Sequence, residues 1–158
     1  MIEIIPMMSE HLDAVYEIEC STFAIPWARS DFEHELHGNN LSIYYVAKDN
    51  GTVVGYCGMW HVVNEGHITN IAVAESSRGQ GIGNMLIDAL ETEARAREMI
   101  GLTLEVRIGN ERAMRLYNKH GFRVEGIRKN YYADTKEDAA IMWKYFLDRD
   151  REVKRGAE

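Results

Sequence analysis

Apolar residues in the first fifth of the chain change from strand-like to helix-like spacing. Residues 2–6 predict a strand, and the apolar positions after them recur every three or four residues, as on one face of a helix. We expect this helix to begin at Ser9 and to continue to about Phe23, because a serine side chain can accept a hydrogen bond from a free N–H group at a helix start. Its apolar positions are Leu12, Val15, Tyr16 and Ile18.

The next segments predict a short helix and a β-hairpin. Ser30-Asp31-Phe32-Glu33 has the pattern of a capping box, and Gly38 is expected to end the helix that follows it. Two apolar segments, 41–48 and 52–63, flank the tripeptide Asp49-Asn50-Gly51. Asn-Gly suits the positive φ angles of a tight turn, so these segments are predicted to pair as a hairpin.

The second half of the chain predicts further strands and two more helices. A strand is expected from about His67, a helix after the glycine-rich loop at 79–83, and a strand at 102–107. Asn110 is expected to cap a helix that Gly121 ends, before strands near 122–127 and 139–146. This order predicts an α/β protein with a mixed sheet, in which residues 1–147 form one domain and 148–158 a charged C-terminal tail.

Composition narrows the possible partners. The chain has 158 residues, is 46% hydrophobic and carries a formal net charge of −7, which argues against a broad nucleic-acid interface and favours a cationic partner. The start lacks a basic segment followed by an apolar one, and no apolar run is long enough to span a membrane, so we expect a cytoplasmic protein. Cys20 and Cys57 lack the spacing of metal ligands, and we expect both to be buried thiols and no metal to be bound.

Residues 76–86, SSRGQGIGNML, carry glycine at alternate positions, namely Gly79, Gly81 and Gly83. Glycine allows backbone N–H groups to converge on an anion, and a helix N-terminus adds positive potential, so the segment is expected to hold a phosphate. The ATP-binding pattern GxxxxGK[ST] is excluded because no lysine follows, and GxGxxG is excluded because position 84 is asparagine. A plain glycine-rich turn remains the alternative.

Several motifs together resemble a known family. Residues 78–83, RGQGIG, are similar to the pyrophosphate loop of the GCN5-related N-acetyltransferases. The segments ITNIAVAESSRGQGIGNMLI, LTLEVRIGNERAMRLYNKHGF, RKNYY and EDAAIM resemble the bacterial members of that family that acetylate the N-terminal alanine of ribosomal protein S18. This resemblance extends from about residue 2 to residue 146. It implies a mixed, mostly antiparallel central sheet with flanking helices, acetyl-CoA as co-substrate, and a protein N-terminus as acceptor.

The resemblance leaves the acceptor open. The pieces GHIT, YYAD and EDA also resemble the catalytic subunits of archaeal and eukaryotic N-terminal acetyltransferases, which makes a general N-terminal acetyltransferase an alternative. An acetyltransferase of small amines and a non-catalytic coenzyme-binding regulatory module are two others.

The resemblance also implies a binding role for particular residues. The pantetheine arm of the coenzyme is expected to pair with the backbone of strand residues 71–73 and to contact Asn110, and the N–H groups of residues 79–84 are expected to bind the pyrophosphate. The complete set of implied cofactor-binding residues is Ile71, Ala72, Val73, Arg78, Gly79, Gln80, Gly81, Ile82, Gly83, Asn84 and Asn110.

Acetyl transfer to an amine needs a base, because an α-amino group with a pKa near ~8 is mostly protonated at neutral pH. Along 102–107, Thr103, Glu105 and Arg107 fall on one face of the strand. Spacing alone fits an ion pair between Glu105 and Arg107 at least as well as catalysis. The resemblance implies that Glu105 accepts the proton, through water, with His67 as a possible relay.

Aromatic residues supply the remaining expected roles. Tyr117 has the helical spacing of a core residue, and the resemblance implies that it is the acid that protonates the coenzyme A thiolate. It also implies that Trp27, in the AIPW segment, and Tyr131 and Tyr132 bind the acceptor peptide, although a plain aromatic cluster explains the two tyrosines almost as well. Glu19 borders the apolar face of the first helix, where a carboxylate could meet a cationic peptide, but a solvated position at the helix edge is expected.

Overall fold

The computed structural model describes residues 1–146, and the charged tail expected at 148–158 lies outside them. Seven strands form one mixed sheet in the order β1-β2-β3-β4-β5-β7-β6. The pairs β1–β2, β2–β3, β5–β7 and β6–β7 are antiparallel, whereas β4 and β5 are parallel. The predicted α/β class with a mostly antiparallel sheet is therefore confirmed.

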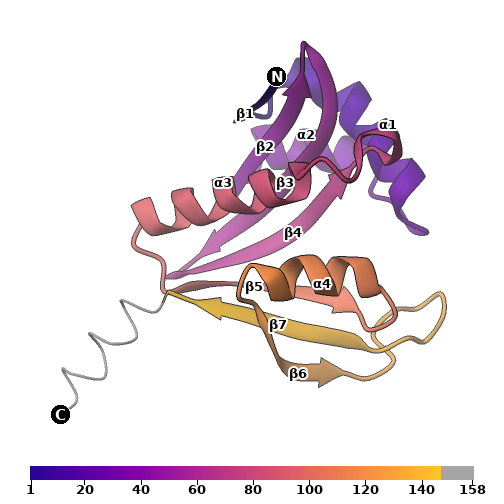
Figure 1. Ribbon diagram of the computed structural model, residues 1–158, viewed down its shortest axis with the longest axis vertical. Coiled ribbons are helices and arrows are strands. Elements are labelled where there is room, and N and C mark those ends of the chain that lie inside the picture. Colours follow the sequence, from indigo (N-terminus) through magenta and orange to yellow (C-terminus); the bar gives the residue numbers. More distant parts are fainter. Residues whose placement is uncertain (147–158) are drawn as a thin grey trace. The chain divides into compact units, whose positions relative to one another are not determined.

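The chain divides into two compact units, and β4 (Glu65–Val73) and α3 (Ile82–Ala96) each contribute to both (Figure 1). The first unit comprises residues 1–61 and 69–91. The described part of the second comprises 62–68 and 92–146. No helix among residues 1–146 combines the length and apolar character needed to cross a membrane.

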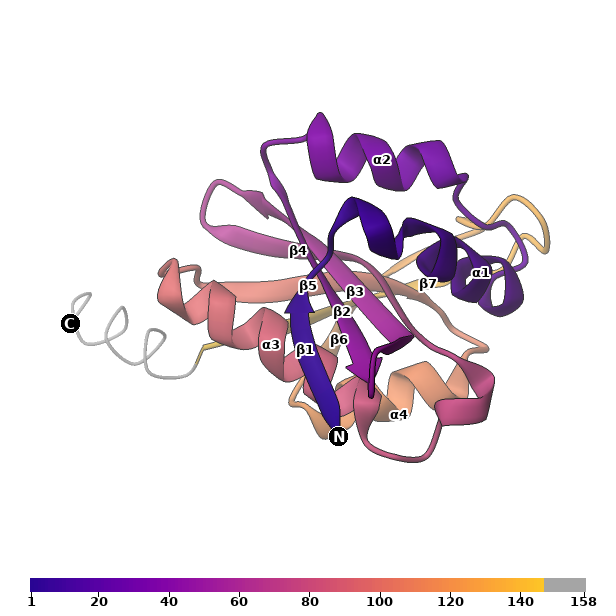
Figure 2. The same ribbon diagram turned by 90° about the horizontal axis from the view of Figure 1, so that it is seen from above.

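The first unit is a hairpin-based sheet with helices on both faces. Its strands are β1 (Ile2–Pro6), β2 (Ser42–Asp49), β3 (Thr52–Val62) and the end of β4. Helices α1 (Leu12–Thr22) and α2 (Arg29–His37) lie on one face and the start of α3 on the other (Figure 2). Positive φ angles of 48° at Asn50 and 91° at Gly51 confirm the predicted β2–β3 turn.

Two predicted helix starts are wrong by one to three residues. Ser9 does not cap α1, because residues 9–11 form a 3₁₀ turn in which the Ser9 hydroxyl is hydrogen-bonded to the His37 Nε2, 2.8 Å away. In α2 the cap is Ala28, whose N–H donates to the Asp31 carboxylate at 2.8 Å. In the first case the serine hydroxyl bonds to a residue of α2 instead of to a free N–H group of α1. In the second case the cap lies two positions before the expected Ser30, and Asp31 accepts the hydrogen bond at the helix start.

The core of the first unit lies between its sheet and the helices α1 and α2. Its buried side chains come from both helices, from three strands and from Met7 after β1, and the rings of Phe32 and Tyr56 lie edge to face with 5.7 Å between their centroids. The cluster consists of Met7, Leu12, Val15, Ile18, Phe32, Tyr44, Val46, Tyr56 and Ala72. This packing fixes the path of the chain from α1 into α2.

The second unit is built around β5 (Gly101–Arg107), which pairs with the start of β4 on one side and with β7 (Ala139–Tyr145) on the other. Strand β6 (Arg123–Arg128) then pairs with β7. Helix α4 (Glu111–Lys119) follows β5, and the Asn110 side chain accepts a hydrogen bond from the Ala113 N–H at 3.2 Å. The predicted cap is confirmed.

The expectation that both cysteines are buried is wrong for one of them. Cys57 is buried in β3, and burial raises the pKa of its thiol. Cys20 is exposed on α1, because it lies on the helix side that faces away from the core. The helix is amphipathic, so a residue two positions after the buried Ile18 falls on its polar side.

Candidate active site

Strand β4 leads through a 3₁₀ turn at Glu75–Ser77 into the glycine loop, which continues directly into α3. Gly79 and Gly81 have φ angles of 84° and 80°, which disfavour other residues, whereas Gly83 lies inside the first turn of α3. A Cβ atom at Gly79 would meet nothing within 4 Å, and one at Gly81 would meet only the Asn84 side chain at 4.0 Å. The loop is therefore open on this side, with backbone N–H groups at a helix N-terminus, an arrangement that fits a pyrophosphate.

Arg78 has a local partner. Its Nε donates to the Val73 backbone oxygen at 3.1 Å, which ties the glycine loop to the end of β4. In the same strand, the Ala72 side chain is buried in the core, while Ile71 and Val73 are half-buried. Residues 65–67 of β4 pair with β5. The residues expected to bind the pantetheine, 71–73, lie beyond this paired segment.

Glu105 lies in β5 and contacts Arg128, the last residue of β6, and Tyr131, which follows that strand. Its Oε2 is 3.3 Å from the Nε of Arg128, and its side chain is 32% exposed. Tyr131 also interacts with this carboxylate. Burial first, and then the charge of Glu105 and a hydrogen bond to it, raise the pKa of the Tyr131 hydroxyl. The structure thus brings together the expected base and one expected acceptor residue.

The alternative ion pair between Glu105 and Arg107 does not form. Arg107 instead makes a bidentate contact with Asp134, with Nη–Oδ distances of 2.9 and 3.0 Å. This contact lowers the pKa of the Asp134 carboxyl group, through the hydrogen bond first. The Arg107 guanidinium therefore pairs with two carboxylates of the neighbouring loop and not with Glu105. The first is Asp134, and the second is Glu137, which lies 3.7 Å from Arg107.

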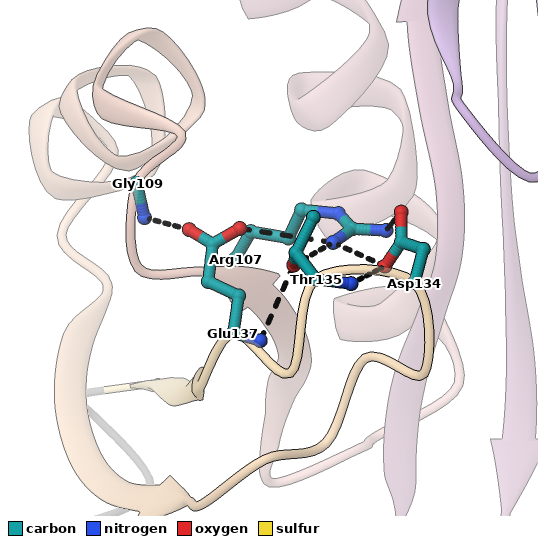
Figure 3. A network of polar contacts seen from close by, with 5 residues as sticks. All are labelled: Arg107, Gly109, Asp134, Thr135 and Glu137. Atoms are coloured by element: carbon teal, nitrogen blue, oxygen red, sulfur yellow. Dashed lines mark hydrogen bonds and ion pairs between the residues drawn. The ribbon is translucent and has the colours of Figure 1, made fainter.

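Arg107 organises the loop that joins β6 to β7 (Figure 3). Its Nη1 also donates to the Thr135 hydroxyl at 3.2 Å, and Glu137 accepts a hydrogen bond from the Gly109 N–H at 2.6 Å. The guanidinium lies 4.0 Å from the centroid of the Tyr132 ring, a cation–π geometry. The loop is therefore attached to β5 and to the segment after it at several points.

The two adjacent tyrosines lie edge to face, with ring centroids 5.1 Å apart. Tyr131 is 48% exposed, whereas Tyr132 is half-buried, and burial raises the pKa of its hydroxyl to about 12. Both therefore remain protonated near neutral pH and can donate hydrogen bonds. One is accessible for an acceptor, and the other is held beneath the Arg107 guanidinium.

Tyr117 is buried on α4 and packs against Phe122, with 5.7 Å between ring centroids. This position agrees with the core residue that its helical spacing predicts. Of the histidines, His120 ends α4 as its C-cap, and His67 lies on β4 with its Nε2 2.9 Å from the Glu65 carboxylate. Glu105 and Tyr117 both belong to the second unit, whereas the glycine loop belongs to the first.

Comparison with known proteins identifies the family. The model of the acetyltransferase (GNAT) family matches residues 12–122, more than half of the chain. The chain belongs to the GNAT family of acetyltransferases. It is therefore an acyltransferase, as its motifs predicted.

Among the relatives of this GNAT chain, the [ribosomal protein bS18]-alanine N-acetyltransferase of Escherichia coli K12 is 35% identical over 133 residues, which cover 83% of the chain and 88% of the relative. A Bacillus subtilis 168 protein provisionally named as the same enzyme is 44% identical over 137 residues, or 87% of the chain and 91% of the relative. The crystal structure of the Escherichia coli ribosomal-protein-S18-alanine N-acetyltransferase superposes with a TM-score of 0.84 at 33% identity and covers 92% of this chain and 94% of that one.

The structure of this GNAT chain places one carboxylate differently from the expectation drawn from its sequence. Glu19, expected at a solvated helix edge, is only 2% exposed. Its carboxylate accepts a hydrogen bond from the Trp27 N–H at 2.9 Å, another from the Tyr56 hydroxyl, and a third from the Asn70 side chain at 3.4 Å. The only sequence signal was a carboxylate next to Ile18 on the apolar face of α1.

No group of three or more histidine, cysteine, aspartate or glutamate side chains within residues 1–146 is arranged to hold a metal ion. The candidate site residues of this GNAT enzyme offer carboxylate, phenol and backbone groups. A carboxylate can accept a proton, a phenol can donate one, and backbone N–H groups can stabilise negative charge.

Proposed function

We propose that this enzyme moves the acetyl group of acetyl-CoA to the N-terminal α-amino group of a protein, and that this acceptor is the N-terminal alanine of ribosomal protein S18. The observation that carries the proposal is the 35% identity, across 88% of its length, to an Escherichia coli enzyme with that name. Because ribosomal proteins are made in the cytoplasm, the reaction would take place there.

The glycine loop supports acetyl-CoA as the co-substrate. Its open, positive-φ positions at Gly79 and Gly81 suit a pyrophosphate, which the N–H groups of residues 79–84 would bind. The backbone of Ile71, Ala72 and Val73 would pair with the pantetheine arm, and Asn110 would contact it as well as capping α4. Arg78 would act indirectly, since its bond to the Val73 oxygen fixes the loop.

The chemistry requires that a C–N bond forms while a C–S bond breaks. Glu105 would accept the proton from the attacking amine, directly or through a water molecule, with His67 as a possible relay. Tyr117 would donate its hydroxyl proton to the departing sulfur, which is feasible because a thiolate whose parent thiol has a pKa near ~8.5 is readily protonated. Each role uses a group that is present on β5 or α4.

The region proposed to bind the acceptor contains several acidic side chains. Glu105 is accessible beside the exposed Tyr131, and Asp134 and Glu137 lie on the following loop. Arg107 and Arg128 offset part of this local charge, and the net charge of −7 of the whole chain favours a cationic N-terminus such as that of a basic ribosomal protein. Trp27, Tyr131 and Tyr132 would contact the first residues of the acceptor.

The test is an acetylation assay read by mass spectrometry. The enzyme is incubated with acetyl-CoA and either a peptide that copies the S18 N-terminus, a panel of unrelated N-terminal peptides, or free amino acids. Strong preference for the S18 peptide, reduced in both Glu105→Gln and Tyr117→Phe, is the expected result. Equal modification of the whole panel would replace S18 by a general N-terminal specificity, and preference for free amino acids would indicate a small-amine enzyme.

A binding measurement accompanies the assay. Coenzyme A is expected to raise the melting temperature, because a ligand that binds only the native state stabilises it. Stabilisation without acetylation of any acceptor would contradict the proposed activity and favour a coenzyme-binding regulatory module.

A further inference from the structure

We propose that Glu19 is a positioning residue for the acceptor, and that its buried carboxylate fixes the backbone of the loop at residues 23–28. This inference rests on the proposed function, because it takes Trp27 in that loop as an acceptor-binding residue. Glu19 itself has no route to the reacting atoms, since it is 2% exposed.

The carboxylate is bonded to the loop and to the sheet at the same time. One oxygen, Oε2, accepts a hydrogen bond from the Trp27 N–H at 2.9 Å. The other, Oε1, accepts bonds from the Tyr56 hydroxyl on β3 and from Asn70 on β4. A loop N–H is thereby held at a fixed place relative to two strands of the same unit.

Burial makes this contact strong. A buried carboxylate without donors would be very costly, so its three hydrogen bonds act together to keep it in place. The negative charge also raises the pKa of Tyr56, after the larger effect of burial, so that the hydroxyl stays protonated and continues to donate. Of the two contacts from nitrogen donors, the one from the Trp27 N–H at 2.9 Å is shorter than the one from Asn70 at 3.4 Å, so the loop is the more closely held partner.

Backbone hydrogen bonds hold the two ends of the loop, at Phe23 and Ala28, and its middle is exposed. Ala24, Ile25 and Pro26 are exposed, and Ile25 is 61% exposed. The Trp27 ring is half-buried and packs on Phe32, with 5.3 Å between centroids. The Glu19 hydrogen bond therefore holds the backbone of Trp27, the loop residue whose ring packs against the core.

Glu19 also bonds to the residue before the proposed pantetheine strand. Asn70 precedes Ile71, but its side chain has a second bond, accepted from the Tyr44 hydroxyl at 3.3 Å. Sheet pairing and this second partner are expected to hold β4 when Glu19 is changed. The prediction is thus specific to the acceptor and leaves the coenzyme unaffected.

Glu35 provides a matched control. It is a second buried carboxylate of the first unit, 5% exposed, and it accepts hydrogen bonds from Trp60 at 2.9 Å, Asn39 at 2.7 Å and Ser42. None of these partners belongs to the 23–28 loop. Glu35→Gln removes the same charge from the same unit without touching Trp27.

Two measurements on the full chain test the inference. Hydrogen exchange by mass spectrometry is expected to be about fivefold faster in residues 23–28 of Glu19→Gln, because an amide oxygen is a weaker acceptor than a carboxylate. The KM for the S18 peptide is expected to rise by a similar factor while the KM for acetyl-CoA stays within about twofold. Glu35→Gln is expected to lower the melting temperature without either effect.

The outcomes separate the inference from the proposed function. If both variants leave the loop exchange and the peptide KM equal to those of the wild type, or if both change them equally, Glu19 has no positioning role. If exchange becomes faster in Glu19→Gln alone but the peptide KM does not change, the loop does not bind the acceptor and the inference is also overturned. A wild-type enzyme that acetylates no peptide would overturn the proposed function instead, and the exchange experiment would still decide whether Glu19 anchors the loop.

Discussion

The Glu105 carboxylate lies 3.3 Å from Arg128 at the end of β6, and not against Arg107, its neighbour on the same face of β5. Arg107 is bound to Asp134 instead. The two arginines therefore have different partners. Arg128 pairs with the proposed base, and Arg107 holds the loop between β6 and β7. Glu105 is left 32% exposed, so an amine or a water molecule can reach it.

Changing Glu105→Gln is expected to lower kcat for the acceptor peptide by about 100-fold or more, because positioned general bases contribute about 10² to 10⁴. The melting-temperature shift with coenzyme A should persist, since Glu105 lies outside the glycine loop. Steady-state kinetics and thermal melting measure the two effects. Glu125→Gln, on exposed β6 with a bond to Tyr145, is the control and should retain wild-type kcat. A Glu105→Gln enzyme with wild-type kcat would exclude the assigned base.

Changing Gly79→Ala should weaken coenzyme binding and lower stability. The φ angle of 84° costs an alanine about 1–2 kcal/mol even though the space around the Cβ position is open. Gly51→Ala, in the β2–β3 turn with a φ of 91°, should lose similar stability. Urea unfolding and titration with coenzyme A compare them, and only Gly79→Ala should bind the coenzyme less tightly. Equal affinity in both variants would argue against the loop as the pyrophosphate site.

His11 is expected to make stability fall in mildly acidic solution. Its Nδ1 accepts a hydrogen bond from the Met8 N–H at 2.9 Å, and its Nε2 is buried without a partner among the described residues. Burial, and then the charge of Lys48, lower the pKa of this imidazole below 6.5. The unfolded chain therefore takes up a proton near pH 6.5 that the folded chain does not, and stability decreases as pH falls below that value.

Urea unfolding at pH 7.5 and pH 5.5 measures this contribution of His11. The variant His11→Asn, which keeps an acceptor for the Met8 N–H, should lose less stability between the two values than the wild type. His34→Asn, at an exposed position on α2, should behave like the wild type. An identical loss in all three proteins would show that protonation of His11 does not contribute to the pH dependence of stability.

Val63 is a site at which substitution should stabilise the protein. It is 90% exposed in the turn between β3 and β4 and has a φ of 56°, which is unfavourable for a β-branched residue. Val63→Asn should raise the free energy of unfolding by about 0.5–1 kcal/mol, because asparagine tolerates this conformation. Val124→Asn, at a half-exposed strand position, should instead be neutral or destabilising. Urea unfolding of both variants decides the point, and a less stable Val63→Asn would count against backbone strain there.

Local chemistry could be predicted from the sequence, and contacts between distant residues could not. The Asn50-Gly51 turn and the Asn110 cap depend on neighbouring residues alone, and both were predicted correctly. The burial of Glu19 depends on Tyr56, 37 residues later, and the choice of partner by Arg107 on Asp134, 27 residues later. A carboxylate on an amphipathic helix is ordinarily solvated, so only the folded structure could show that three donors converge on it.

The attachment of the β6–β7 loop to Arg107 has a consequence for how acceptor preference can change. The strand residue sets the path of the loop through contacts with Tyr132, Asp134, Thr135 and Glu137, whereas Ala133 is exposed between these anchors. Under the proposed function, substitutions at such a position would alter what an incoming peptide contacts without moving the proposed base. Enzymes descended from one ancestor can therefore diverge in the proteins that they modify by exchanging a few loop residues, while the reaction itself is inherited intact.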